Sequence, residues 1–157
     1  MYVTQPGATV IVTAPGDQPP AAGAQVLLPR QGAIVGIGGF CADDNGAMAV
    51  DGSRIKLWTC NDTKAQVWTL HTDGTVRVVG FCLRIANNAT VPGARVEIWT
   101  CNGDASQQWS VVDDHIVNTR TGLCLASPGD LAVEGTELTV ESCGPAPGQR
   151  WALPPLL

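Results

Sequence analysis

The sequence predicts an all-β fold built from three copies of one unit, and three observations lead to this prediction. A Gln-x-Trp triplet occurs three times, and its tryptophans are 41 and then 42 residues apart. Six cysteines keep the same period, as three pairs whose members are each 19 residues apart. Between these marks the chain has short β-rich runs separated by Gly, Asn, Asp and Pro, without helical periodicity. A fixed internal period indicates a repeat architecture, here a three-fold one.

The repeats cover residues 32–153, in units of about 32–71, 72–112 and 113–153, and a short tail, 154–157, follows them. A unit of this length is too small to bury a hydrophobic core by itself, so the three units have to share one. The first strands are expected at Ile34–Ile37, Thr75–Val79 and His115–Asn118, and the third strands at Arg54–Thr59, Arg95–Thr100 and Glu137–Ser142. The fourth strands are expected to begin at the Gln-x-Trp triplets. Twelve short strands of this kind favour a closed barrel with no free edge.

Alternation in the third strands tells the inward face from the outward one. Ile55 and Leu57 share one face with their counterparts in the later repeats, and this face is expected to form the core. The same alternation turns Trp58 and Trp99 outward. An exposed tryptophan usually has a binding partner. The tryptophans of the triplets, by contrast, are expected inside the core, namely Trp68, Trp109 and Trp151.

Residues 1–31 differ in composition from the repeats and form a separate segment. They are apolar and rich in Pro and Gly, and Thr9–Thr13 is a β-branched run typical of a strand. Such a segment is expected to be an extended arm that docks onto a larger protein assembly or onto further copies of the chain. The alternative is that the arm folds back on the repeats of its own chain.

Composition and charge exclude two classes of partner. The net charge is −5 and the nine basic residues are scattered, whereas nucleic-acid binding requires a basic patch. No apolar run approaches the roughly 18 residues of a membrane-spanning helix. We therefore expect neither a nucleic-acid partner nor membrane insertion.

The cysteine pattern favours a disulfide framework, although six reduced core thiols are the alternative. Three equal intervals fit local closure within each repeat better than any other connectivity, which predicts the bridges Cys41–Cys60, Cys82–Cys101 and Cys124–Cys143. Metal sites would need close Cys-x-x-Cys or His partners, so neither a metal nor a cofactor is predicted. Disulfides indicate an oxidising location. Met1 opens no signal-peptide pattern, so either a signal has been removed or the protein reaches an oxidising exterior by another route. We expect an extracellular location or the surface of a released particle such as a virion.

The spacing of these motifs resembles one known family. Three Gln-x-Trp triplets, each preceded by a Cys-to-Cys segment, combine with Leu57-Trp58-Thr59-Cys60-Asn61 and its copy Ile98-Trp99-Thr100-Cys101-Asn102. Over residues 32–153 this pattern is similar to the ricin B-chain-type lectin family. The resemblance implies a β-trefoil, in which six strands form a short barrel and six form hairpins that cap it. It also implies one potential sugar site per repeat.

The resemblance places the best sugar site in the first repeat. The family's carboxylate corresponds to Asp43, its aromatic platform to Trp58 and its supporting amide to Gln66. This repeat departs from the family at Ala65, where an Asn is common, and at Lys56, where a polar amide is often found. Lys56 is nevertheless a candidate sugar-binding residue together with Asp43, Trp58 and Gln66. Asp43 precedes a turn-rich run, so a turn residue is an alternative interpretation of it.

The other two repeats are incomplete by the same comparison. The second keeps Trp99 and Gln107 as weaker candidate contacts but has Arg84 in place of the carboxylate, a change that either favours an acidic sugar or ends binding. Pairing of Glu97 with Arg84 is one way in which the site would be closed. The third has Ala126 and Glu141 at the two key positions, so we expect no site there. A structural hydrogen bond explains the three glutamines as well as sugar binding does, since Gln149 remains in the third repeat.

The leading hypothesis is a non-catalytic carbohydrate-binding module that binds weakly, chiefly through the first repeat. Catalysis is not expected: His71 and His115 are not a repeat interval apart, and the adjacent pairs Asp43-Asp44 and Asp113-Asp114 cannot flank a glycosidic bond. The rival hypothesis is a structural or surface-display module with degenerate sugar sites. Its arm would dock into a larger assembly, as in a bacteriophage virion or tail decoration protein.

Overall fold

The computed structural model describes residues 28–157, so the predicted arm and its strand Thr9–Thr13 lie outside the described residues. The strands in chain order are β1 (Arg30–Gly32), β2 (Cys41–Asp44), β3 (Ile55–Trp58), β4 (Trp68–Leu70), β5 (Val76–Val78), β6 (Phe81–Ile85), β7 (Val96–Trp99), β8 (Trp109–Val112), β9 (His115–Asn118), β10 (Cys124–Ala126) and β11 (Thr139–Glu141). Short 3-10 turns occur at Ile37–Gly39, Asn45–Ala47, Lys64–Gln66, Ala86–Asn88, Ala105–Gln107, Pro128–Asp130 and Pro147–Gln149. In residues 28–157 no helix is long and apolar enough to span a membrane.

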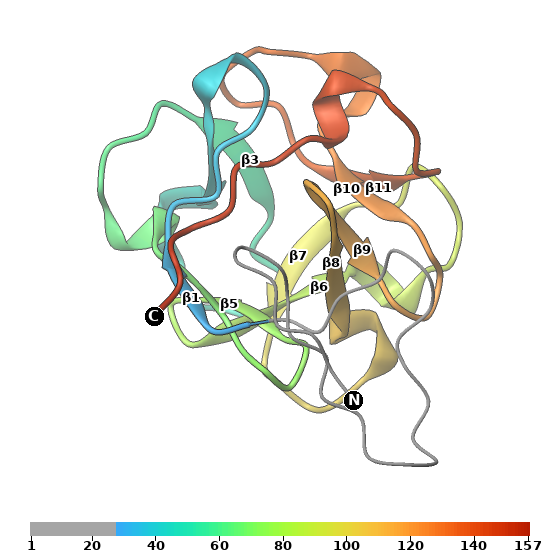
Figure 1. The fold of residues 1–157 in the computed structure, drawn as a ribbon. Helices are drawn as coiled ribbons and strands as arrows, with labels where there is room; N and C mark the ends of the chain where they lie inside the picture. The colour runs from blue at the N-terminus through green and yellow to red at the C-terminus, as the bar shows by residue number, and fades with distance from the viewer. Residues whose placement is uncertain (1–27) are drawn as a thin grey trace, which may run out of the picture.

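The strands form an antiparallel β-trefoil, which confirms the predicted fold class (Figure 1). Five strands follow the order β1-β4-β5-β6-β7, four follow β11-β10-β9-β8, and β2 pairs with β3. Each repeat contributes one hairpin of its second and third strands, namely β2–β3, β6–β7 and β10–β11. These hairpins carry the outward-facing positions at which a site is expected.

Two strands differ from the prediction at the point where the chain closes on itself. The first repeat opens with β1 at Arg30–Gly32, while Ile37–Gly39 is a 3-10 turn with φ values of 70° and 76° at its two glycines. Left-handed backbone of this kind ends a strand. In the third repeat, Ala152 makes only an isolated bridge to Val35, because Pro154 and Pro155 follow and cannot donate ladder hydrogen bonds.

The tail lies along β1 and completes its outer edge. Gln31 N donates to Pro155 O at 3.1 Å, and Leu157 N donates to Pro29 O at 2.9 Å. The other edge of β1 pairs with β4, with Arg30 opposite Leu70. The sheet therefore begins two residues before the predicted repeat boundary and includes the last residues of the chain.

The shared core is built around the three triplet tryptophans, as predicted. Each is at most 2% exposed, and each indole Nε1 donates to a backbone carbonyl 26 positions earlier in the chain, Ala42, Leu83 or Leu125. The predicted inward residues of the third strands surround them, namely Ile55, Leu57, Val96, Ile98, Leu138 and Val140. This repetition indicates that the tryptophans set the spacing of the hairpins and leaves them no surface role.

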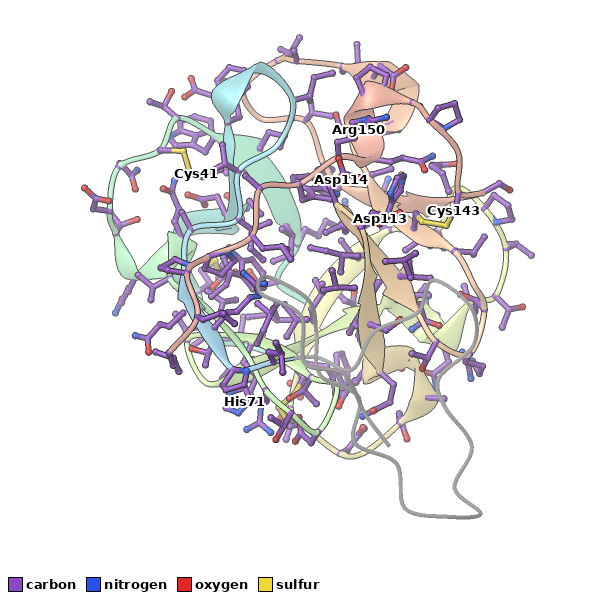
Figure 2. The ribbon with its side chains drawn as sticks, in the orientation of Figure 1. Cys41, His71, Asp113, Asp114, Cys143 and Arg150 are labelled. Carbon is purple, nitrogen blue, oxygen red and sulfur yellow. A yellow bond between two sulfur atoms is a disulfide. The ribbon has the colours of Figure 1, made fainter. Side chains whose placement is uncertain are left out.

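Three disulfides join the residues that the equal intervals pair: Cys41–Cys60, Cys82–Cys101 and Cys124–Cys143. Figure 2 shows Cys41 and Cys143 on different repeats, each within its own bridge. Every bridge ties the start of a second strand to the segment just after the third strand. Each hairpin is thus closed covalently next to its outward-facing site positions.

Successive repeats are also joined by a ring of three backbone hydrogen bonds. The loop of each hairpin donates a glycine N–H to the third strand of the next repeat: Gly52 to Ile98, Gly93 to Val140 and Gly135 to Leu57, at 2.7 to 2.8 Å. As a consequence, every outward-facing site position has a loop from another repeat beside it.

Candidate functional site

The β2–β3 register assembles the predicted site of the first repeat. Asp43 lies opposite Lys56, and Cys41 lies opposite Trp58. The side chain of Trp58 faces outward and the residue is 36% exposed, as the alternation predicts. Asp43, Lys56 and Trp58 line an open cleft of about 380 Å³, together with residues of the neighbouring turns, among them Asn61, Thr63 and Ala65. Asp43 is part of a strand and not of a turn.

Gln66 holds the carboxylate of Asp43 in place. Its Nε2 donates to Asp43 Oδ2 at 2.8 Å and to Thr59 O at 2.9 Å, and its Oε1 accepts from Asn61 N at 2.9 Å. All three bonds fix the amide orientation in a buried position. Asp43 Oδ1 receives no hydrogen bond from the described side chains, so it is free to accept from a ligand.

Burial raises the pKa of Asp43 above its ordinary value, against the hydrogen bond from Gln66 and the positive charge of Lys56, which both lower it. Its neighbour Asp44 is fully buried, and burial raises its pKa too. Asp44 Oδ1 accepts from the Ser53 hydroxyl at 2.5 Å, and Oδ2 is buried without a partner among the described residues. Asp44 therefore belongs to the interior, and only Asp43 lines the cleft.

Lys56 lies over the aromatic platform, a contact that alternation alone did not predict. Its Nζ is 4.2 Å from the centroid of the Trp58 ring and donates to Asn45 Oδ1 at 2.9 Å. A ring that stacks on this face of Trp58 has to displace the amine. The displacement costs little, because exposed cation–π contacts contribute only about 0.5–1 kcal/mol.

The second repeat has the same platform, but its own side chains occupy it. The Arg84 guanidinium lies 3.7 Å above the Trp99 ring, and its Nη2 and Nε contact Glu97 Oε2 at 2.7 and 2.8 Å. The side chains of this ion pair are 9% and 14% exposed. The predicted pairing of Arg84 with Glu97 is confirmed, and the guanidinium covers the outward face of Trp99.

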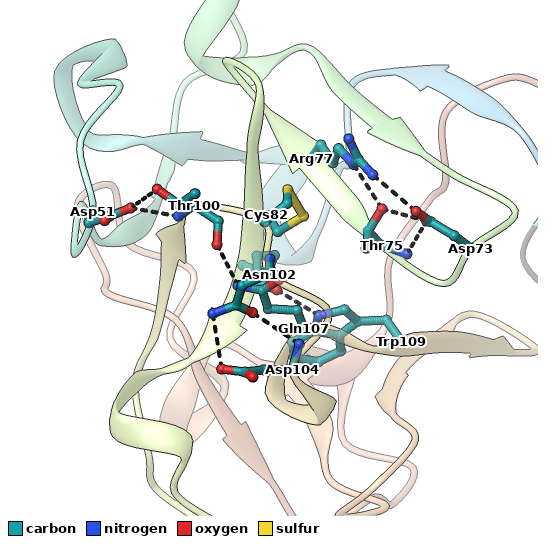
Figure 3. Close-up of a disulfide and its surroundings, with 12 residues drawn as sticks. Asp51, Asp73, Thr75, Arg77, Cys82, Thr100, Asn102, Asp104, Gln107 and Trp109 are labelled. Carbon is teal, nitrogen blue, oxygen red and sulfur yellow. Dashed lines mark hydrogen bonds and ion pairs between the residues drawn. A yellow bond between two sulfur atoms is a disulfide. The ribbon is translucent and has the colours of Figure 1, made fainter.

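All three triplet glutamines make the same two bonds, whether or not a site accompanies them. Gln107 bonds Asn102 N and Thr100 O, and Gln149 bonds Gly144 N and Ser142 O, at 2.9 to 3.0 Å (Figure 3 shows Gln107). Their shared role is to secure the turn after the third strand. Only Gln66 makes a further bond, to a carboxylate.

The third repeat has neither platform nor acceptor, in line with its sequence. Ala126 lies opposite Thr139 where the first repeat pairs Asp43 with Lys56. Glu141 stands at the platform position, and its Oε2 accepts from the Thr139 hydroxyl at 2.6 Å.

Glu134 borders the first-repeat site and was missed by the sequence analysis. It comes from the loop of the third repeat, and its Oε1 accepts from Thr59 N at 3.0 Å and from the Thr59 hydroxyl. Aligning the repeats would have found it, because Asp51 is its counterpart in the first repeat and makes the same two bonds to Thr100 (Figure 3).

The two histidines do not lie together in the described part of the chain. Figure 2 places His71 well away from Asp113 and Asp114. His115 is held between Asp114 Oδ1 at 3.1 Å and Gly144 O at 2.9 Å, and Arg150 contacts Asp114 at 3.2 Å. Within residues 28–157 no group of three or more His, Cys, Asp or Glu side chains could hold a metal ion.

Comparison with known proteins gives consistent matches. Residues 30–151 match the model of the ricin-type β-trefoil lectin domain. Ribosome-inactivating protein SNAIf of Sambucus nigra is 35% identical over 120 residues, which are 76% of this chain and 20% of that protein. The seed lectin of Trichosanthes anguina is 48% identical over 44 residues, 28% of this chain and 8% of that protein. The chain therefore spans only about a fifth, or less, of the length of these relatives.

Solved structures agree with these matches. A non-toxic homologue of type II RIPs from Momordica charantia, in complex with α-methyl-D-galactoside, has a TM-score of 0.74 and 32% identity, covering 81% of this chain and 48% of that one. The agglutinin from Abrus precatorius has a TM-score of 0.74 and 30% identity, covering 80% and 48%. The designed three-fold symmetric protein ThreeFoil, at 24% identity, has a TM-score of 0.73, covers 80% and 99%, and supports the fold alone.

Proposed function

Because the chain belongs to the ricin-type β-trefoil lectin domain family, we propose that it binds a glycan without transforming it, weakly and chiefly through the first repeat. One observation carries the proposal. Only in the first repeat does a carboxylate oriented by the triplet glutamine stand beside an exposed tryptophan in an open cleft. The three disulfides support an oxidising, extracellular location for this activity.

Each residue of the cleft supplies one component of sugar recognition. Trp58 offers a flat apolar face for the C–H groups of a pyranose. Asp43 accepts hydrogen bonds from adjacent hydroxyls, and bonds to a charged acceptor are the stronger kind. Gln66 holds Asp43 so that no orientation has to be acquired on binding. Lys56 moves off the Trp58 ring and stays near enough to bond a ring or hydroxyl oxygen.

The Momordica charantia homologue is in complex with a galactoside, so a galactoside is the first probe for this chain. An exposed cleft of this size buries little surface, and we expect a dissociation constant of about 1 mM for a single sugar. Multivalent presentation then raises the apparent affinity by a factor on the order of 100 or more.

A polymer that carries many galactosides, together with a glycan array, tests the proposal. Trp58→Ala should lower binding at least about tenfold, because it removes the stacking surface. Trp99→Ala is the matched control: it removes the equivalent outward tryptophan from the filled second repeat, and binding should stay as in the wild type. Thermal unfolding shows whether both variants are folded. Equal binding by wild type and Trp58→Ala would refute a first-repeat site.

The rival hypothesis of a display module docked by its arm rests on residues 1–27, outside the described part of the chain. It stays a prediction, and so does any protein partner.

A further inference from the structure

Strand β3 of the first repeat has different neighbours along its two edges, and Trp58 lies between them. Along one edge β3 pairs with β2, which carries Asp43. Along the other edge Leu57 N donates to Thr136 O at 2.8 Å, and Leu57 O accepts from Gly135 N at 2.7 Å. The loop of the third repeat therefore lies across β3 from Asp43.

This loop comes close to the platform and brings polar and apolar groups with it. A Cβ at Gly135, where φ is +91°, would be 4.0 Å from Trp58 Cζ3, so the loop backbone lies beside the far edge of the indole. Val133 is 56% exposed. Glu134 Oε1 is taken up by the two bonds from Thr59, while Oε2 receives none from the described side chains.

The region around Trp58 contains the amine of Lys56 and carboxylates from two repeats. Hydrogen bonds from Thr59 lower the pKa of Glu134, as does the charge of Lys56, so the carboxylate is ionised at neutral pH. Lys56 acts on the pKa of Asp43 as well. Lys56 lies opposite Asp43 on one side and is bridged to Glu137 on the other, where Arg54 pairs with Glu137 at 3.0 Å. Among the described residues, Asp43 and Glu134 therefore face only one further cation, Lys56, and this region repels an anionic ligand.

We propose that the first-repeat site continues past Trp58 into a second subsite, formed by Glu134 and Val133 of the third repeat, that selects neutral oligosaccharides. This inference rests on the proposed sugar binding at Asp43 and Trp58. Neighbouring strands are about 4.8 Å apart, so the segments with Asp43 and Glu134 are roughly 10 Å apart across β3. Glu134 also meets Thr59, further along the chain than Lys56, which Asp43 faces, so the full separation is larger than this. One pyranose ring does not cover this span, and a ligand that reaches both carboxylates needs at least two linked rings. The second ring donates a hydroxyl to Glu134 Oε2 and packs on Val133.

A purely structural role for Glu134 is the competing explanation, and the chain contains the control for it. Asp51 caps Thr100 in the same way, next to Trp99. At that position Arg84 covers the platform, so Asp51 has the capping role without an accessible sugar site. A variant at Asp51 therefore measures the effect of losing the cap alone.

Isothermal titration with α-methyl-D-galactoside, lactose and sialyllactose tests the inference on the full chain. The wild type should bind lactose about tenfold more tightly than the monosaccharide, and sialyllactose more weakly than lactose. Glu134→Ala should lower lactose binding to the level of the monosaccharide and leave the monosaccharide unchanged. Glu134→Gln keeps an acceptor for Thr59 and removes the charge, so it should bind sialyllactose better than the wild type does. Asp51→Ala, which removes the equivalent cap from Thr100, should change none of these affinities.

The outcomes separate the two proposals. If none of these sugars binds, or if Trp58→Ala leaves their binding unchanged, the proposed function itself fails. If the wild type binds lactose and the monosaccharide equally and Glu134→Ala changes neither, the second subsite is refuted while the first-repeat site stands. If a folded Glu134→Ala variant binds all three sugars more weakly than the wild type by the same factor, the second subsite is also refuted, because Glu134 would then act only by positioning Thr59.

Discussion

The first and second repeats carry the same cross-strand charge pair with its signs reversed. In the first, the acid Asp43 is on β2 and the base Lys56 on β3; in the second, the base Arg84 is on β6 and the acid Glu97 on β7. The long basic side chain starts from opposite strands in the two hairpins. Arg84 therefore reaches the platform and Glu97 together, whereas Asp43 is held back by Gln66 and leaves an open cleft.

The comparison teaches that the site and the scaffold are separate in this fold. Tryptophan, glutamine, disulfide and the Thr cap are alike in the two repeats. What differs is whether one short acid or one long base occupies the second-strand position. A site can thus be filled by a side chain of its own repeat without disturbing the hairpin that carries it.

The largest effect is expected when the second-repeat pair is broken. Arg84→Ala leaves Glu97 largely buried without its cation, and should lower the free energy of unfolding by about 3 kcal/mol. Lys56→Ala removes a more exposed contact in the first repeat and should cost at most about 1 kcal/mol. Urea denaturation compares the two. Equal small losses would mean that the Arg84–Glu97 pair is only a surface contact.

Exchanging the charges should open the second site, with a smaller effect. The double variant Arg84→Asp with Glu97→Lys reproduces the first-repeat arrangement and gives Gln107 Nε2 a carboxylate to orient. Sugar stoichiometry should rise from one to two per chain, and binding to a multivalent glycan by about tenfold. In a Trp58→Ala background the same exchange should restore binding. Unchanged stoichiometry in a folded variant would show that the charge pair does not decide access to Trp99.

The smallest effect is expected at Asp44, which is buried beside the first-repeat site. It occupies the position that Ile85 has in the second repeat. The pKa of Asp44 is raised by burial, so the folded state keeps its proton to a higher pH than the unfolded state. Stability from this group is full below the ordinary pKa of about 3.9 and is lost as pH rises through the raised value. Asp44→Asn should flatten that part of the pH profile of the unfolding free energy.

Asp73 is a control because its pKa is shifted in the opposite direction from that of Asp44. The hydrogen bond from the Thr75 hydroxyl lowers the pKa of Asp73, so its contribution is lost as pH falls below the ordinary value. Asp73→Asn should therefore change only the acid end of the profile. A profile that Asp44→Asn leaves untouched would contradict a buried proton at Asp44.

The sequence was sufficient for what depends on periodicity. The intervals between tryptophans and cysteines predict a three-fold all-β fold and the three bridges, the resemblance to the lectin family adds the β-trefoil, and alternation predicts Leu57 inside and Trp58 outside. Cross-strand pairing follows from the repeat, so the contact of Arg84 with Glu97 could be expected as well.

The remainder depends on distances in space that no local pattern encodes. Alternation gives the face of a residue, but not the path of a long side chain, and so Lys56 over Trp58 was not expected. Glu134 is 75 positions from Thr59 and reaches it only through the closure of the trefoil. The start of β1 was misplaced because its strand is defined by pairing with β4 and the tail, and not by its own composition.

The ring of glycine hydrogen bonds affects the order in which the strands can complete their pairing while the chain is being synthesised. Strand β3 of the first repeat is synthesised early, but its outer edge stays unpaired until Gly135 and Thr136 arrive from the third repeat. Contacts of such long sequence separation form slowly. The hairpin of the first repeat is therefore completed only after the third repeat has been synthesised, although it precedes that repeat in the chain.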